Sequence, residues 1–122
     1  MLLLDMTDKI RIGNAIKSKT PFFTGKNQDG FLVLGELLNK DLVKDPHNME
    51  LELKINGELR QSDNTGNMHF KINDQMDFIE DNGTTLNEGD LLLSGTPEGM
   101  GPVKPGDFIE ACLKTPEGEV IS

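Results

Sequence analysis

The clearest pattern of apolar and polar positions begins at Met49 and predicts a half-buried β-strand. Apolar residues occupy every second position from Met49 to Ile55 and alternate with charged residues. A period of two places the apolar side chains on one face of a strand. Asn56-Gly57 follows and predicts a two-residue hairpin turn, because both turn positions need a positive φ. The return strand is expected to begin with residues 58–61.

Two uninterrupted leucine runs predict strands that are covered on both faces. These runs are Leu2-Leu3-Leu4 and Leu91-Leu92-Leu93, and an unbroken apolar run of this length suits a buried strand. Residues 108–111 also favour a strand, and residues 68–72 alternate again between apolar and polar.

Helices are expected to be few and short. Residues 8–20 mix charged residues with isoleucines and end at Thr20-Pro21, which stops a helix. Residues 74–81 are a second helix candidate with one apolar side. Together with the strands, these segments predict a mainly β (α+β) fold without internal repeats.

The charge balance excludes two classes of partner. The chain has 12 Lys plus Arg and 21 Asp plus Glu among its 122 residues, so its formal net charge is −9, and its pI is about 4.6. We therefore expect neither a basic footprint for nucleic acid nor a polybasic patch for a membrane surface. No apolar run approaches the roughly 18 residues of a membrane span.

The residues that often bind metals or act as nucleophiles are sparse. Cys112 is the one cysteine, which excludes an intrachain disulfide framework and a multi-cysteine metal site. A reducing compartment is the simple inference, and we expect Cys112 to be a packing residue. His47 and His69 have no partner at metal or triad spacing, so both are expected to be structural or exposed.

Three features carry candidate chemistry, each beside a plainer interpretation. Asp5 ends an apolar strand, where a carboxylate either binds a hard cation or caps a helix. Lys26 lies in a polar loop, where its ammonium either binds a carboxylate or a developing enolate or is simply solvated. Segment 95–102 contains three glycines and two prolines. It either brings backbone N–H groups and the Thr96 hydroxyl to an anion or is a tight connection between strands.

Taken in order along the chain, these segments resemble a known family. They are L-D-M-T at residues 4–7, Lys26 in its loop, N-G-E-L-R-Q at 56–61, G-D at 89–90 and G-T-P-E-G-M-G-P-V at 95–103. This order resembles the fumarylacetoacetate hydrolase (FAH) superfamily, and within it the small single-domain acylpyruvases and oxaloacetate-handling members. G-T-P-x-G-x-G-P-V combined with N-G-x-x-x-Q is specific, and the resemblance covers nearly the whole chain.

The resemblance implies a fold, a cofactor and a reaction. The fold is a mixed β-roll, and the cofactor is a Mg²⁺ or Mn²⁺ ion that chelates the carboxylate and 2-oxo oxygens of a 2-oxoacid. The implied activity is that of a C–C bond hydrolase or lyase, or a tautomerase, acting on acylpyruvates or oxaloacetate. A divalent ion on the keto oxygen stabilises the enolate that such reactions form.

The resemblance also implies roles for five residues by position. Asp5 resembles a metal-binding carboxylate, and Lys26 resembles the catalytic lysine close to the metal and the substrate oxygens. Thr96, with Gly95 beside it, resembles the hydroxyl that holds the substrate carboxylate. Lys9 is a substrate-binding candidate at a position where many relatives have Arg. Lysine keeps the positive charge but cannot form the paired hydrogen bonds of a guanidinium with a carboxylate.

Other elements of the family are implied to precede the first motif. The family's Glu-x-Glu pair and its His/Glu dyad lie upstream of the motif that here contains Asp5, and one carboxylate does not satisfy the octahedral ligation of Mg²⁺. We therefore expect residues 1–122 to be the C-terminal portion of a single catalytic domain, incomplete at the N-terminus, with weak metal binding. The alternative is a catalytically incomplete pseudoenzyme or a dimer-forming module.

The expected partners are a small-molecule 2-oxoacid and a second copy of the chain, since members of the family commonly form homodimers. Exposed strand edges favour such association. The resemblance leaves two compartments open, the mitochondrion and the cytoplasm.

Overall fold

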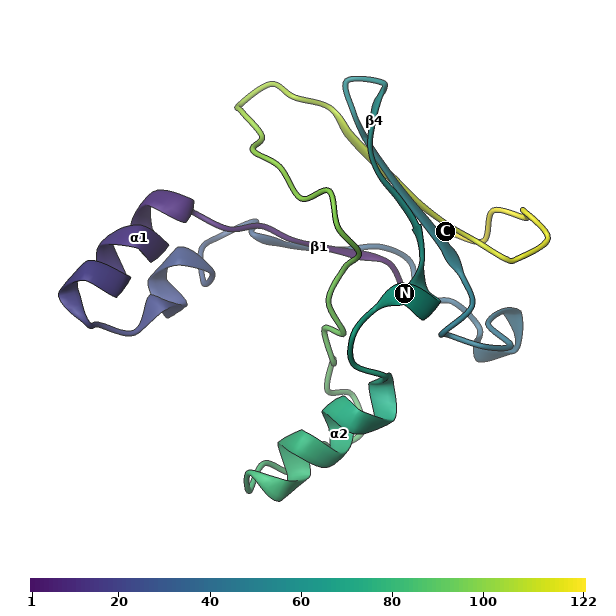
Figure 1. Cartoon of the computed structure of the whole chain (residues 1–122), viewed down its shortest axis with the longest axis horizontal. Coiled ribbons are helices and arrows are strands. Elements are labelled where there is room, and N and C mark those ends of the chain that lie inside the picture. The colour runs from purple at the N-terminus through teal and green to yellow at the C-terminus, as the bar shows by residue number, and fades with distance from the viewer. The chain divides into compact units, whose positions relative to one another are not determined.

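The structure is a computed structural model that describes all 122 residues (Figure 1). The chain folds as two units. The first unit comprises Met1–Leu38 together with Ser122, and the second comprises Asn39–Ile121. None of the helices is long and apolar enough to span a membrane.

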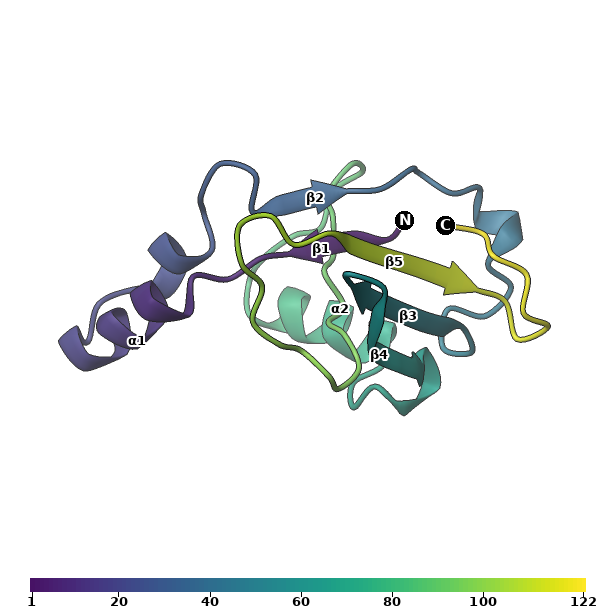
Figure 2. The ribbon, with the colours of Figure 1, turned by 90° about the horizontal axis from the view of Figure 1, so that it is seen from above.

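The first unit is built on two short antiparallel strands, which lie side by side in Figure 2. Leu4 lies opposite Val33 in this pair. The elements in chain order are β1 (Leu3–Asp5), α1 (Lys9–Ser18), the 3-10 helix η1 (Phe22–Gly25) and β2 (Leu32–Leu34). Two residues of the predicted leucine run, Leu3 and Leu4, therefore lie in a strand, while Leu2 precedes it, and both strand leucines are only half-buried. The expected burial on both faces is wrong, because this two-stranded sheet is covered only in part: all three residues of β2 are exposed.

Helix α1 confirms the helix predicted within residues 8–20. Asp8 caps its start by accepting a hydrogen bond from the Arg11 backbone N–H at 2.9 Å, which satisfies one of the free donors of the first turn. The helix ends at Lys19, which adopts a left-handed conformation with φ of 52°. The chain therefore leaves the helix just before Thr20-Pro21.

The second unit contains a three-stranded antiparallel sheet in the order β4-β3-β5 (Figure 2). Its strands are β3 (Glu50–Ile55), β4 (Glu58–Asn64) and β5 (Ile109–Lys114). The Asn56-Gly57 turn joins β3 to β4, with φ of 54° and 81° at its two residues. Both values are positive, so the predicted hairpin is confirmed.

Helix α2 (Ile72–Asp81) confirms the second predicted helix and starts earlier than expected. The Asp74 carboxylate accepts a hydrogen bond from the Lys71 backbone N–H at 3.2 Å, and this contact begins the helix at Ile72. The expected alternation over residues 68–72 therefore does not form a strand. The short 3-10 helices η2 (Lys40–Leu42) and η3 (Thr65–Asn67) complete the elements.

The second leucine run does not form the predicted buried strand. Residues 91–93 are in neither a strand nor a helix, and no strand of the sheet pairs with them. A strand needs a hydrogen-bonded neighbour, and residues 91–93 lack one. With two antiparallel sheets and two α-helices, the mainly β (α+β) prediction is confirmed.

The buried core is small in both units. Its buried apolar side chains are Ala15 on α1 and, in the second unit, Met49 and Ile55. Met49 immediately precedes β3 and Ile55 ends it, so the core of the second unit follows the alternation found in the sequence. Many large apolar side chains remain exposed, including all three of β2.

Candidate functional site

In the first unit the structure brings together two of the predicted site residues. The Lys26 ammonium donates a hydrogen bond to the Asp5 carboxylate and forms an ion pair with it. Asp5 is the last residue of β1, and Lys26 directly follows η1. The pair therefore joins the end of a strand to a loop across 21 positions of the sequence.

The backbone explains why these two side chains meet. The Met6 N–H donates to the Phe31 carbonyl at 2.8 Å, and the Asp8 N–H donates to the Gly25 carbonyl at 2.8 Å. These bonds hold the segment after β1 against the segment that carries Lys26.

Gly25 lets η1 pack closely on α1. A Cβ added at this buried residue would lie 2.7 Å from side-chain atoms of Ile12 and 3.1 Å from the Asp8 carbonyl oxygen. Only a residue without a side chain fits there. The backbone hydrogen bond from Arg11 also holds the pKa of Asp8 below its usual value, so Asp8 stays ionised as a cap.

The ion pair leaves donors free for a ligand. The side chains of Lys26 and Asp5 are 43% and 41% exposed, so solvent reaches both. An ammonium has three N–H donors, and Asp5 accepts one of them, which leaves two for the oxygens of an anionic molecule. Lys9 lies at the first position of α1, is exposed and forms no ion pair in the structure.

In the second unit the predicted residues Gly95 and Thr96 lie on an exposed loop that is bonded to β4. The Gln61 side-chain amide donates to the Thr96 hydroxyl oxygen at 2.9 Å and to the Pro97 carbonyl at 2.8 Å. Gln61 is the last residue of the N-G-x-x-x-Q motif, but the sequence alone predicts no role for it. In the structure Gln61 lies opposite Leu53, because the register shifts between Leu53 and Lys54, and no pattern in the sequence reveals that shift.

The roles in metal and substrate binding that the resemblance implies for Asp5, Lys26 and Thr96 stay predictions. The first two belong to the first unit and Thr96 belongs to the second.

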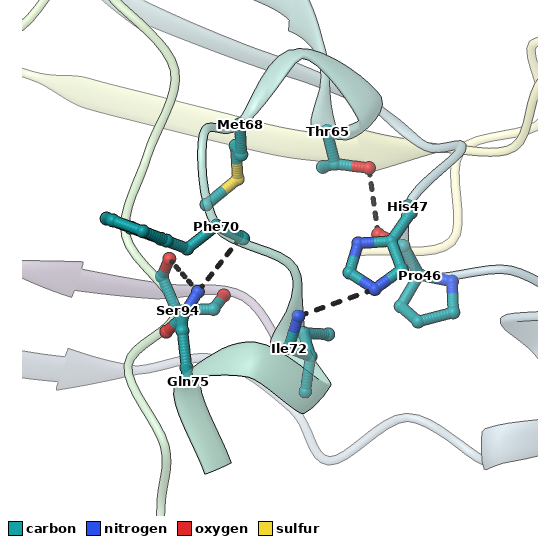
Figure 3. A pocket seen from close by; sticks show the side chains of 8 residues that line it. All are labelled: Pro46, His47, Thr65, Met68, Phe70, Ile72, Gln75 and Ser94. Carbon is teal, nitrogen blue, oxygen red and sulfur yellow. Dashed lines mark hydrogen bonds between the residues drawn. The ribbon is translucent and has the colours of Figure 1, made fainter. Parts of the chain in front are cut away.

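A small cavity in the second unit has polar and apolar lining side chains (Figure 3). His47 Nε2 accepts a hydrogen bond from the Ile72 backbone N–H at 3.5 Å, and the Gln75 amide donates to the Ser94 carbonyl at 3.2 Å. The cavity has a volume of about 40 Å³, which suits ordered water and is far below the roughly 300–1,000 Å³ of a ligand pocket. His47 is half-buried and contacts the backbone of Ile72, which agrees with the expectation of a structural or exposed residue.

Two further expectations concern single residues. His69 is exposed and its ring packs edge-on against Phe70, with ring centroids 4.6 Å apart. Cys112 is half-buried in β5, with its sulfur 3.8 Å from a carboxylate oxygen of Glu52. The exposure of His69 agrees with the expectation of a structural or exposed residue, and the half-buried position of Cys112 agrees with its expected packing role.

The residues present do not form a complete site for Mg²⁺ or Mn²⁺. The structure contains no group of three or more His, Cys, Asp or Glu side chains that could hold a metal ion. Asp5 offers one carboxylate, and Lys26 already binds it. Mg²⁺ requires close to octahedral oxygen ligation, which this chain does not supply alone.

The chain matches a family model and several curated relatives. The model for the fumarylacetoacetate (FAA) hydrolase C-terminal family matches residues 1–120. The mitochondrial oxaloacetate tautomerase oaa1 of Schizosaccharomyces pombe is 42% identical over 118 residues, which cover 97% of this chain and 53% of that protein. The mitochondrial oxaloacetate tautomerase FAHD1 of Arabidopsis thaliana is 44% identical over 110 residues, covering 90% and 49%. The mitochondrial oxaloacetate decarboxylase of Dictyostelium discoideum is 38% identical over 112 residues, covering 92% and 51%.

Solved structures of the same family share this fold. A fumarylacetoacetate hydrolase family protein from Yersinia pestis CO92 matches with a TM-score of 0.84 and 31% identity, over 92% of this chain and 53% of that one. Yeast ynq8, of the same family, matches with a TM-score of 0.87 and 26% identity, over 98% and 51%. The chain thus spans about half the length of the relatives it matches. The family model, the sequence identity and the shared fold together show that the chain belongs to the fumarylacetoacetate hydrolase family.

Proposed function

We propose that this chain is the substrate-binding part of an enzyme that acts on oxaloacetate or a related short 2-oxoacid, such as an acylpyruvate. The Asp5–Lys26 ion pair at the end of β1 is the observation that carries the proposal. The names of the relatives support the substrate class, because they describe those proteins as oxaloacetate tautomerases and an oxaloacetate decarboxylase.

Tautomerisation and decarboxylation of a 2-oxoacid share one chemical requirement. Both pass through an enol or enolate, in which negative charge develops on the 2-oxo oxygen. An ammonium held beside that oxygen stabilises the charge as it forms. Lys26 is suited to this role because Asp5 holds its ammonium at the strand end while two N–H donors stay free.

The remaining predicted residues bind the charged ends of the substrate in this proposal. Thr96 is an exposed residue whose hydroxyl binds the substrate carboxylate, with Gly95 beside it, and Lys9 adds positive charge at the start of α1. Asp5 also supplies one oxygen ligand for a Mg²⁺ or Mn²⁺ ion, whose other ligands come from outside residues 1–122. We assign no reaction step to the ion.

Calorimetric titration of the purified chain with oxalate, in the presence of Mg²⁺, tests the proposal. We expect weak but detectable binding in the wild type, because these residues supply one carboxylate to the metal, and no detectable binding in Asp5→Ala. Lys26→Gln should weaken binding by about 10- to 100-fold, because it removes a charged hydrogen bond. Lys17→Gln makes the same change at an exposed helix position and should leave binding unchanged. Absence of heat at millimolar oxalate and Mg²⁺ would contradict the proposal for this chain.

The second candidate is a catalytically incomplete homodimeric module, and the exposed apolar side chains favour it. Phe22, Phe23 and the three residues of β2 are each about half exposed or more. Unpaired strand edges also promote association. Sedimentation equilibrium tests this candidate: a dimer that Val33→Lys dissociates supports it, and a monomer at all concentrations contradicts it.

We also infer a mitochondrial location, on the names of the same relatives. Subcellular fractionation of the source cells, followed by detection with an antibody against this chain, tests the inference. Recovery in the cytosolic fraction alone would contradict it.

A further inference from the structure

Gln61 is the one polar side chain that the structure buries, with 6% of its surface exposed. Its amide nitrogen faces three oxygens of the loop after residues 91–93: the Thr96 hydroxyl at 2.9 Å, the Pro97 carbonyl at 2.8 Å and the Glu98 carbonyl at 3.4 Å. A buried amide is normally satisfied by its surroundings. Here all the hydrogen bonds that the Gln61 amide nitrogen donates go to one loop.

The partners fix the direction of these hydrogen bonds. A carbonyl oxygen only accepts, so the atom that faces Pro97 and Glu98 must be the NH₂ nitrogen of Gln61, which only donates. The Thr96 hydroxyl oxygen is therefore an acceptor in its contact with Gln61. Since a hydroxyl carries its own proton, that proton is free to donate to another group.

The loop also touches β4 directly, beside Gln61. A Cβ added at Gly99 would lie 2.3 Å from the Arg60 carbonyl oxygen, and Gly99 has a φ of +104°. This close approach seats the loop on the strand at the residue next to Gln61. The two segments, N-G-E-L-R-Q and G-T-P-E-G, thus meet at a contact that needs both a glycine and an amide donor.

We propose that Gln61, the buried residue of β4, is a positioning residue that leaves Thr96 to act as a hydrogen-bond donor to a bound carboxylate, because its amide donates to the Thr96 hydroxyl and cannot accept the hydroxyl proton. This inference rests on the proposed function, in which Thr96 binds the substrate carboxylate. It adds a direction to that contact: the Thr96 hydroxyl donates its proton to a ligand acceptor such as a carboxylate oxygen, because the Gln61 amide cannot accept it.

A double-mutant cycle with oxalate as the probe tests the coupling. Gln61→Glu keeps the shape but places an acceptor beside Thr96, so the Thr96 proton turns inward. Thr96→Val keeps the shape and removes the hydroxyl. We expect each single variant to lose about 10- to 100-fold in affinity. Gln61→Glu should cost less than about threefold when Thr96 is already Val, because residues that act through one contact are non-additive.

A matched control separates positioning from general loop packing. The Gln75 amide donates to the Ser94 and Phe70 carbonyls and to no hydroxyl, so Gln75→Glu makes the same chemical change without touching Thr96. We expect oxalate affinity to change by less than about threefold in this variant. Equal losses in Gln61→Glu and Gln75→Glu, or losses from Gln61→Glu that are the same with Thr and with Val at position 96, would overturn the inference.

Hydrogen exchange of the ligand-free chain keeps this test independent of binding. By NMR, the two side-chain amide protons of Gln61 should both exchange at least roughly tenfold more slowly than those of the part-exposed Gln28. In Thr96→Val, one proton of the Gln61 pair should lose this protection while the other, bonded to Pro97, keeps it. If the wild type fails to bind oxalate, the proposed function fails, but the exchange measurement still tests the contact between Gln61 and Thr96. Selective loss of protection in Thr96→Val supports this contact, and unchanged protection of both protons refutes it.

Discussion

Replacing Gly99 by alanine tests how closely the 95–101 loop approaches β4. The added Cβ would lie 2.3 Å from the Arg60 carbonyl oxygen, whereas ordinary contact begins near 3.4 Å. The neighbour is backbone within a strand, so the loop has to move. That movement breaks the hydrogen bonds from Gln61 to Thr96 and Pro97, which lie at 2.9 Å and 2.8 Å.

The magnitude follows from two separate effects. Gly99 has a φ of +104°, and an L-residue in a left-handed conformation costs roughly 1–2 kcal/mol. Loss of the two hydrogen bonds adds about 0.5–1.5 kcal/mol each. Gly99→Ala should therefore lower the free energy of unfolding of the second unit by about 2–5 kcal/mol.

Gly106→Ala is the matched control for backbone conformation alone. Gly106 has a φ of +93°, and an added Cβ there would meet nothing within 4 Å. It should cost only the roughly 1–2 kcal/mol of the left-handed conformation. The two variants should thus differ by about 1–3 kcal/mol, which is the contribution of the close approach.

Urea denaturation followed by far-ultraviolet circular dichroism measures both variants. The chain contains no Trp and no Tyr, so intrinsic fluorescence offers little signal. NMR shifts of the Gln61 side-chain amide should move in Gly99→Ala and stay in place in Gly106→Ala. Equal loss of stability in both variants, with an unchanged Gln61 signal, would refute the close contact between loop and strand.

Three further predictions concern the core, the sheet and the first unit. Ile55→Val removes one methylene from a side chain that is 5% exposed and should cost about 0.5–1.5 kcal/mol in urea denaturation; no change would place Ile55 outside the core. The hydrogen bond from Lys114, at 2.5 Å, lowers the pKa of Glu52 below its usual 4.5, so this contribution is present above pH 4.5 and is lost as the pH falls through the lowered value. The acid decline of the urea midpoint should therefore be shallower in Glu52→Gln, and identical curves would contradict the pairing. Gly25→Ala should displace the segment that carries Lys26, because the added Cβ would lie 2.7 Å from Ile12; the Lys26 side-chain NMR signals would move, and unchanged signals would contradict this packing.

The local elements of this chain could be predicted because their causes are local. Alternation from Met49 to Ile55 specifies a one-sided strand, and Asn56-Gly57 supplies two residues that tolerate positive φ. The structure has both, with φ of 54° and 81° in the turn. The segment of residues 74–81 likewise forms a helix as predicted, with its start moved to Ile72 by a cap that the pattern did not reveal.

Patterning failed where a segment needs a partner from elsewhere in the chain. Residues 91–93 are as apolar as residues 2–4, yet only the latter form a strand, because β2 returns beside β1 and nothing pairs with 91–93. An apolar run states that a segment favours burial. It does not state whether a neighbouring strand is present to receive its hydrogen bonds.

By itself the sequence determined the charge, the α+β class, the hairpin and the motifs that carry the family resemblance, since each depends on residue types and their spacing. Only the tertiary structure decided which side chains touch. Lys26 meets Asp5 across 21 positions, and Gln61 meets Thr96 across 35. Such contacts depend on how the chain returns on itself, which no short-range period encodes. The hydrogen bonds of the buried Gln61 amide depend on this return of the chain, because its partners Thr96 and Pro97 lie in a distant loop that packs against β4.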